Sequence, residues 1–156
     1  QDAFLAGIAY ALQSGTATTG QVIARPGEVL VAVVGAHLTG MPLNHQLTSR
    51  KARLVTETTT APDYALYALD GTVPPKPGLA RVKDGTGAAI IVEVWAMPEE
   101  AFGSFVNEIP EPLGIGTVRL MDSTRVNGFI AEGIALEAAT DITQFGGWRA
   151  YIASKS

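Results

Sequence analysis

Two segments of the chain are almost wholly apolar, at residues 29–34 and 88–97. Apolar runs without polar alternation are typical of strands that are buried on both faces. Residues 53–60 and 64–69 carry the alternating pattern of half-buried strands. The pattern predicts further strands in the second half of the chain, at residues 117–121, 125–131 and 148–153.

Helical spacing of apolar residues occurs in two places. Near the N-terminus it predicts an amphipathic helix over residues 2–13, followed by a linker rich in Ser, Thr and Gly up to Gly27. This helix could equally pack onto the rest of the protein, and the pattern leaves both arrangements open. Pro98 opens the second helix, and its first turn carries Glu99 and Glu100, which the helix dipole favours.

Turns and loops separate these elements. Residues 35–40 are predicted to form a turn after the first strand, and Pro42 suits the first position of a short helix behind it. Residues 84–87 predict a hairpin-like turn. Residues 71–78 hold three prolines and are expected to form an ordered loop without regular structure. Many strands with two or three helices that do not strictly alternate predict an α+β fold.

The composition is that of a globular protein, with 47% hydrophobic and 17% charged residues. The length allows one domain, which we expect over residues 28–156, after the helix and linker of residues 1–27. A net charge of −4 and the lack of any Lys/Arg-rich run disfavour nucleic acid and anionic membranes as partners. No apolar run approaches the about 20 residues of a membrane span. The start at Gln1 instead of methionine suggests a segment of a longer protein.

The chain contains no cysteine, which excludes disulfides, thiolate catalysis and cysteine-ligated zinc. This absence also fits a cytoplasmic protein. The two histidines lack metal-type spacing, so no metal site is expected. Gly114-Ile-Gly116 is too short and wrongly placed for a dinucleotide site. We therefore expect no cofactor.

The segment Val33-Val-Gly-Ala-His-Leu-Thr-Gly-Met-Pro-Leu-Asn-His-Gln-Leu47 resembles the C-terminal domain of allophanate hydrolases. Several long motifs in the right order are a specific signal, and together they cover nearly everything from about residue 28 onward. The further matching motifs lie at residues 60–67, 71–78, 109–118 and 139–151.

This resemblance implies a γ-glutamylcyclotransferase-like fold. Such a fold is a small mixed β-barrel with two or three flanking helices and a ligand cavity near the first strand, turn and helix. True cyclotransferases place a general-base glutamate just after the helix that follows the central strand. Here Glu108 or Glu111 would sit out of register, so cyclotransferase activity is not expected.

The resemblance also implies a role in urea and allophanate degradation. In the parent enzyme a separate amidase domain with a Ser–Ser–Lys system deaminates allophanate. No such signature occurs in this chain, which is therefore not expected to be an amidase. The C-terminal domain is proposed to remove carbon dioxide from the product, N-carboxycarbamate, or to help assemble the enzyme. The implied partners are a small carboxylate and an amidase domain or subunit.

His45 and His37 are the candidate catalytic residues, because both lie in the motif beside the expected cavity and histidine can act as an acid near neutral pH. His45, in a polar run, is the first choice for the proton donor. The alternative is that each imidazole only satisfies a turn carbonyl.

Candidate substrate-binding residues surround these histidines. The turn could present backbone N–H groups to an anion, since its glycines allow close approach. Side chains could orient a ligand amide or carboxylate, although helix capping is the more natural role for Asn44 and core packing for Tyr64. Lys76 stands between two prolines that could fix its ammonium toward the cavity, or merely shape a loop. The predicted set is Gly35, Ala36, Leu38, Gly40, Asn44, Gln46, Arg50, Tyr64 and Lys76.

Glu93 interrupts the apolar run of residues 88–97. A buried carboxylate there would need a partner or a raised pKa. The alternative is that it faces outward, on the face opposite Val92 and Val94.

Three functions remain open from the sequence: a decarboxylase-type domain, a non-catalytic assembly or substrate-handover module, and another small-acid enzyme on the same fold. A homodimer is compatible with the second, with Trp95, Phe102 and Trp148 as candidate interface aromatics.

Overall fold

The computed structural model describes residues 22–156. The helix predicted over residues 2–13 and most of the linker lie outside the described residues. The helices and strands of the described part are β1 Glu28–Val33, α1 His45–Thr48, β2 Arg53–Thr59, β3 Tyr64–Ala68, β4 Pro77–Arg81, β5 Ile91–Pro98, α2 Glu99–Asn107, β6 Leu113–Arg119, β7 Arg125–Ala131, α3 Gly133–Leu136, β8 Thr140–Asp141, the 3₁₀ helix Thr143–Phe145 and α4 Trp148–Ser154.

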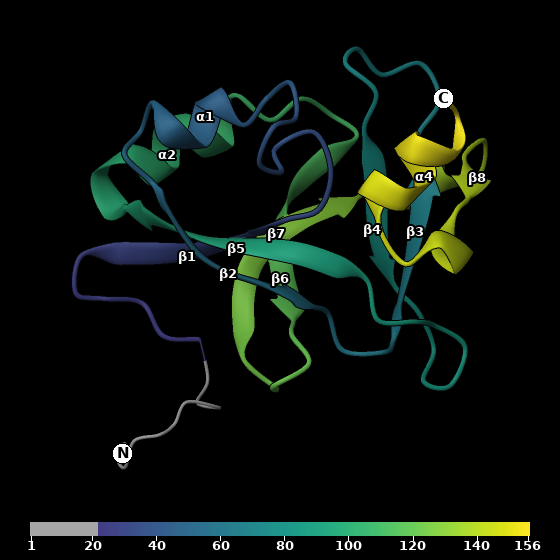
Figure 1. Ribbon diagram of the computed structural model, residues 1–156, viewed down its shortest axis with the longest axis horizontal. Coiled ribbons are helices and arrows are strands. Elements are labelled where there is room, and N and C mark those ends of the chain that lie inside the picture. Colours follow the sequence, from purple (N-terminus) through teal and green to yellow (C-terminus); the bar gives the residue numbers. More distant parts are fainter. Residues whose placement is uncertain (1–21) are drawn as a thin grey trace.

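The strands form two sheets, and the α+β class is confirmed. The larger sheet has the order β2-β5-β1-β7-β6, in which β1 runs parallel to β7 and the other neighbours are antiparallel. The smaller sheet has the order β4-β3-β8 (Figure 1). The single closed barrel expected from the resemblance is not confirmed for the described residues. The edge strands β2 and β6 approach each other at one end, where Thr60 and Leu120 form an isolated bridge.

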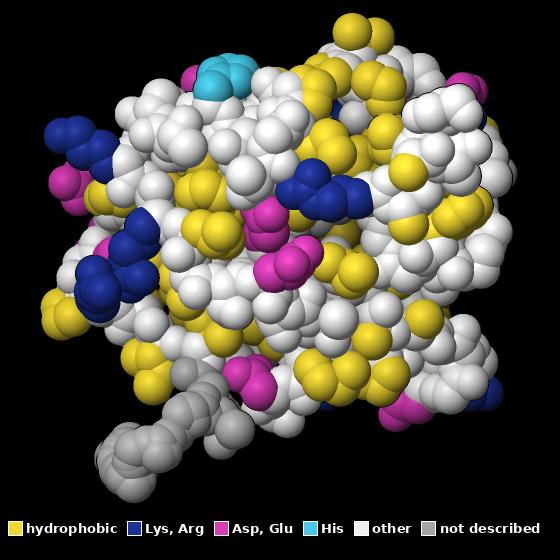
Figure 2. Space-filling view, viewed as in Figure 1, with side chains coloured by type: hydrophobic (Ala, Val, Ile, Leu, Met, Phe, Trp, Pro, Cys, Tyr) yellow, Lys and Arg dark blue, Asp and Glu magenta, His cyan; other side chains and the backbone are white. Residues whose placement is uncertain are grey.

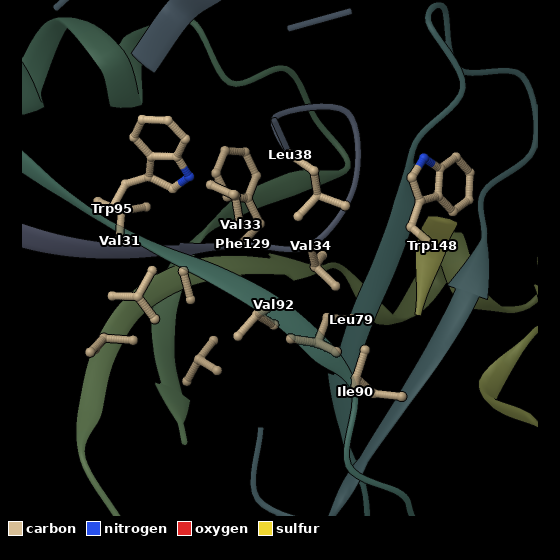
Figure 3. Packing of buried hydrophobic residues seen from close by; sticks show 14 of the residues in the cluster. Val31, Val33, Val34, Leu38, Leu79, Ile90, Val92, Trp95, Phe129 and Trp148 are labelled. Carbon is tan, nitrogen blue, oxygen red and sulfur yellow. The ribbon is translucent and has the colours of Figure 1, made fainter. Parts of the chain in front are cut away.

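The core lies between the layers. Val31 and Val33 of β1, and Val92 and Val94 of β5, are fully buried, which agrees with the apolar runs in the sequence. Phe105 of α2 covers this sheet, and α1 and α2 lie together on one side of it in Figure 1. Figure 3 shows buried side chains of both sheets in one cluster, with Val31, Val33 and Val92 of the larger sheet, Leu79 of the smaller one, and Trp148 of α4 at its far side. Burial of this apolar surface is the main term that stabilises the fold.

Two of the proposed interface aromatics belong to this core. Trp95 is 5% exposed and Trp148 is 4% exposed, so neither is available on the surface of the domain. The prediction that they contact a second copy is therefore wrong. Phe102 is partly buried and packs against the same core.

The C-terminal segment is the main error of the secondary-structure prediction. Residues 148–153 were expected to be a strand but form helix α4. Trp148, Tyr151 and Ile152 follow at three- and four-residue spacing, which places them on one face of a helix. Packing decides between the two readings, because the ring of Tyr151 contacts those of Trp148 and Phe145 at centroid distances of 5.4 Å.

Two smaller differences concern the proline-rich loop and the number of helices. The proline-rich loop ends earlier than predicted, because Pro77 and Gly78 already belong to β4 and pair with Ala68 and Tyr67. The described residues contain four α-helices, α1 to α4, where two or three were expected. No helix within residues 22–156 is long and apolar enough to cross a membrane.

Candidate functional site

A cleft opens where the turn after β1, the loop before β4 and the end of α2 meet. Its volume is about 190 Å³, and its polar lining comes from His37, Gln46, Lys76 and Glu108. Phe129 of β7 closes one side. A second hollow of about 280 Å³ adjoins it and shares Lys76 and Val73 with it. The strand–turn–helix predicted to border a cavity therefore does so.

His37 is held rigidly in this cleft. It is 6% exposed, and its Nε2 lies 2.7 Å from Oε1 of Gln46. Its ring stacks at a tilt on Phe129, with centroids 4.8 Å apart, and meets the edge of Phe105. Asn44 Nδ2 donates a 2.8 Å hydrogen bond to the His37 carbonyl oxygen. Contacts of the ring with Gln46, Phe105 and Phe129 thus fix the imidazole, and the bond from Asn44 fixes the His37 backbone.

Burial lowers the pKa of His37 below its ordinary value of 6.5. The hydrogen bond to Gln46 opposes this shift, and the charge of Lys76 adds to it. Because the amide oxygen of Gln46 can only accept, Nε2 carries the proton. In the neutral ring Nδ1 is then the atom able to take up a proton.

Lys76 brings a positive charge into the same cleft. It is 7% exposed, and its backbone N–H donates to Oγ1 of Thr72. Within residues 22–156 its ammonium has no carboxylate within ion-pair distance. An ammonium that lines a cleft and has no carboxylate partner attracts negative charge, so this site favours the binding of an anion.

Arg50 supports the cleft from behind instead of lining it. Its guanidinium donates to Oγ of Ser104, the carbonyl oxygen of Gln46 and Oε2 of Glu108, at 2.9–3.0 Å. It also lies over the ring of Phe105. These contacts fix the backbone at Gln46, which holds His37, against the end of α2. A substrate would have to displace Glu108 to reach this guanidinium.

Several predicted residues lie elsewhere. His45, the first choice for the acid, is exposed, and its Nδ1 contacts the carbonyl oxygen of Pro42. Tyr64 is buried at the start of β3, where its hydroxyl accepts a hydrogen bond from the Arg119 N–H. Leu38 is a core residue, and Gly40 lies at an exposed turn with a φ of +83°. Asn44 makes no side-chain cap, so the capping role expected for it is wrong.

Gly35 and Ala36 line a narrow inner extension of the cleft beside His37 and Lys76. A Cβ atom at Gly35 would collide with the ring of Pro77. The glycine is thus required for packing of the turn against β4, whatever binds in the cleft.

Sequence reasoning missed Glu108 and Phe129 as lining residues. Glu108 was considered only as a misplaced cyclotransferase glutamate, and Phe129 is an apolar residue of a predicted strand, with nothing in its own segment to mark it as a lining residue. Glu108, at the end of α2, and Phe129, on β7, reach the cleft through the packing of distant elements, for which the sequence carries no local signal.

Glu93 is buried and has hydrogen-bond partners, so of the two alternatives that the sequence left open, the outward-facing one is wrong. Its Oε1 accepts hydrogen bonds from the backbone N–H and Oγ1 of Thr39 and from Nε1 of Trp95, at 2.9–3.1 Å. Its Oε2 pairs with Arg149 of α4 at 3.2 Å. On the face of the molecule drawn in Figure 2, acidic side chains lie beside a basic one near the centre. The carboxylate therefore links the turn that carries His37 to the C-terminal helix.

The allophanate hydrolase C-terminal domain family matches residues 29–153 of the chain. The chain belongs to this family. It is 45% identical to urea amidolyase of Saccharomyces cerevisiae over 126 residues, which cover 79% of this chain and 7% of that protein. The domain thus spans a small fraction of the curated relatives that it matches.

Two solved structures are similar over most of the domain. Allophanate hydrolase of Kluyveromyces lactis is 45% identical, with a TM-score of 0.79 over 82% of this chain and 21% of that one. The protein c4763, described as specific to uropathogenic E. coli, is 32% identical, with a TM-score of 0.74 over 81% of this chain and 96% of that one. The fold therefore occurs both within a much longer chain and in a chain of similar size.

Proposed function

We propose that this allophanate hydrolase C-terminal domain binds a small dicarboxylate in the His37–Lys76 cleft and removes carbon dioxide from N-carboxycarbamate. One observation carries the proposal: Lys76, a residue that is 7% exposed, lines the same cleft as His37, and its ammonium has no ion-pair partner in the described part of the chain. A dianion would supply the missing negative charge. The cleft volume of about 190 Å³ is below the roughly 300–1,000 Å³ of sites for drug-sized ligands, which favours a small substrate.

The reaction breaks one C–N bond of the substrate. Carbon dioxide leaves, and the bonding electron pair stays on nitrogen, which must gain a proton to give carbamate. Lys76 would hold the carboxylate that remains. A dianion bound beside His37 would oppose the lowering of its pKa, so the imidazole could take a proton from solvent in the complex and pass it to nitrogen. The acid role that the sequence favoured for His45 is thereby transferred to His37.

Malonate tests the binding step, because it has the same two carboxylates with carbon in place of nitrogen. Calorimetry should give an affinity that falls about tenfold or more in Lys76→Gln, the cost of losing a charge-assisted hydrogen bond. Lys155→Gln removes the same charge from an exposed position and should bind malonate as the unchanged protein does. Equal affinities for all three proteins would refute the cleft as the binding site.

The catalytic step needs a separate measurement. N-carboxycarbamate would be generated in situ by an added allophanate amidase, and carbon dioxide release would be compared with spontaneous decomposition. General-acid catalysis typically contributes about 10²–10⁴-fold, so His37→Ala should reduce the rate close to the spontaneous one. His45→Ala is the matched control and should retain the rate. A domain that never exceeds the spontaneous rate would not be a decarboxylase.

A substrate-handover or assembly module is the second candidate. It is supported by the small share of the matched relatives that the domain spans, 7% and 21%. Val73, at the rim of the cleft, is 90% exposed, so the cleft mouth offers apolar surface to a neighbouring amidase domain. Malonate binding without any acceleration of decarboxylation would favour this function. Binding of a different acid in a metabolite screen would favour the third, another small-acid enzyme.

A further inference from the structure

A second cavity lies where the two edges of the larger sheet approach each other. It has a volume of about 480 Å³ and shares no lining residue with the His37 cleft. One wall is the segment between β2 and β3, and the other is the end of the β6–β7 hairpin. The walls are joined by the bridge of Thr60 with Leu120 and by a 2.9 Å hydrogen bond from the Ala61 N–H to the Arg119 carbonyl oxygen.

Asp63 is the buried charged group of this cavity, at 6% exposure. Its Oδ2 accepts hydrogen bonds from Nε of Arg81 at 3.1 Å and from Nη2 of Arg119 at 2.7 Å. Burial raises the pKa of the Asp63 carboxyl, but the bonds from Arg119 and Arg81 outweigh this effect and hold the pKa below 3.8. Oδ1 of Asp63 and Nε of Arg119 are buried without a partner within residues 22–156. Oδ2 of Asp63 thus accepts hydrogen bonds from two guanidinium groups, and Oδ1 accepts none within these residues.

A third arginine, Arg125, adds a further positive charge near the cavity. Arg125 stands directly opposite Arg119 in the β6–β7 register, and both line the cavity. Like charges directly opposite each other on neighbouring strands are destabilising. No ion pair of Arg125 occurs within the described residues. Asp84 also lines the cavity, so the charged lining residues are Arg119 and Arg125 with Asp63 and Asp84. Arg81 is not a lining residue, but its bond to Asp63 uses part of that negative charge.

We propose that this cavity binds a small organic carboxylate between Arg119 and Arg125. A planar guanidinium matches a carboxylate with two parallel hydrogen bonds, and an anion between the two arginines would relieve their repulsion. Asp63 is a positioning residue, since it holds one side of the Arg119 guanidinium. The lining also includes Ala61, Pro62 and Met121, which offer apolar contact to the hydrocarbon part of a ligand. This favours an organic acid over an inorganic anion.

Butyrate is a suitable probe, with chloride and phosphate as comparisons at equal ionic strength. In ¹H–¹⁵N NMR titrations, butyrate should shift the amides of residues 61–63 and 119–125, and chloride and phosphate should not. Arg125→Gln should weaken butyrate binding about tenfold, as expected for loss of a charge-assisted hydrogen bond. Lys155→Gln and Lys76→Gln should leave it unchanged, which separates this site from the His37 cleft. Failure of the decarboxylase proposal would not affect this result.

The stability of the unliganded protein distinguishes binding from a structural role. If Arg125 serves a ligand, Arg125→Gln in chloride keeps or raises the melting temperature, because it removes a like-charge pair, and butyrate stabilises only the unchanged protein. Arg119→Lys, which keeps the charge but loses the planar fork, should also bind butyrate more weakly. The proposal is overturned if Arg125→Gln lowers the melting temperature in chloride, or if butyrate acts equally on both proteins.

Discussion

Nε2 of His37 lies 2.7 Å from Oε1 of Gln46, and both side chains are presented by the segment between β1 and the end of α1. Arg50 holds the backbone of Gln46, and Asn44 holds the backbone of His37. A chain of local hydrogen bonds thus sets the ring at the cleft. Glu93 adds a longer-range constraint through Thr39, two residues from His37.

The contact with Gln46 should be visible in the titration of His37. Since the Gln46 hydrogen bond raises the pKa of His37 against the effect of burial, Gln46→Leu should lower that pKa further. NMR of the imidazole Cε1–H signals against pH measures this shift. An unchanged or higher pKa of His37 in Gln46→Leu would contradict the geometry.

Stability should depend on pH through the same residue. The pKa of His37 lies below 6.5 in the folded protein, so the unfolded chain binds the proton first as pH falls. The free energy of unfolding should therefore decrease from about pH 6.5 down to the folded-state pKa of His37, and this contribution should be fully regained above pH 6.5. Urea denaturation between pH 5 and 7.5 measures it. His37→Gln should flatten this part of the profile.

Removing the Glu93 carboxylate should destabilise the domain. Glu93→Ala leaves the two Thr39 donors and the Trp95 indole without their acceptor, and the expected loss is about 3 kcal/mol in the free energy of unfolding. Glu57 is the matched control, because it stands directly opposite Glu93 on β2 but is exposed. Glu57→Ala should change stability by less than about 0.5 kcal/mol or raise it slightly. A Glu93→Ala protein as stable as the control would show that these bonds contribute little.

The two glycines of the turn should respond differently to alanine. Gly35→Ala drives a methyl group into Pro77 and should cost about 1–3 kcal/mol and weaken malonate binding, because the turn and Lys76 must separate. Gly40→Ala meets no atom within 4 Å but holds a φ of +83°, so about 1 kcal/mol of backbone strain is expected, with malonate binding retained. Denaturation and calorimetry on both variants check this. Loss of malonate binding in Gly40→Ala would instead favour the anion-cradle role first expected for the turn.

Local patterns along the chain were enough for most of the elements. The apolar runs at residues 29–34 and 88–97 correspond to β1 and β5, and the acidic start after Pro98 opens α2 as predicted. These features depend on neighbouring residues alone, since strand and helix periods are short. The motif of residues 33–47 also led to the family, which the comparison confirms.

Only the tertiary structure decided which residues share the cleft. His37 and His45 were indistinguishable in kind, and the packing of His37 between Phe105 and Phe129 buries one while leaving the other exposed. Lys76 and Glu108 reach His37 from other segments through contacts between distant elements. The sequence alone determined periodicity, composition and family, because these are properties of the chain itself. Burial, pairing and charge balance depend on which distant segments meet, and that is settled only when the sheets and helices pack.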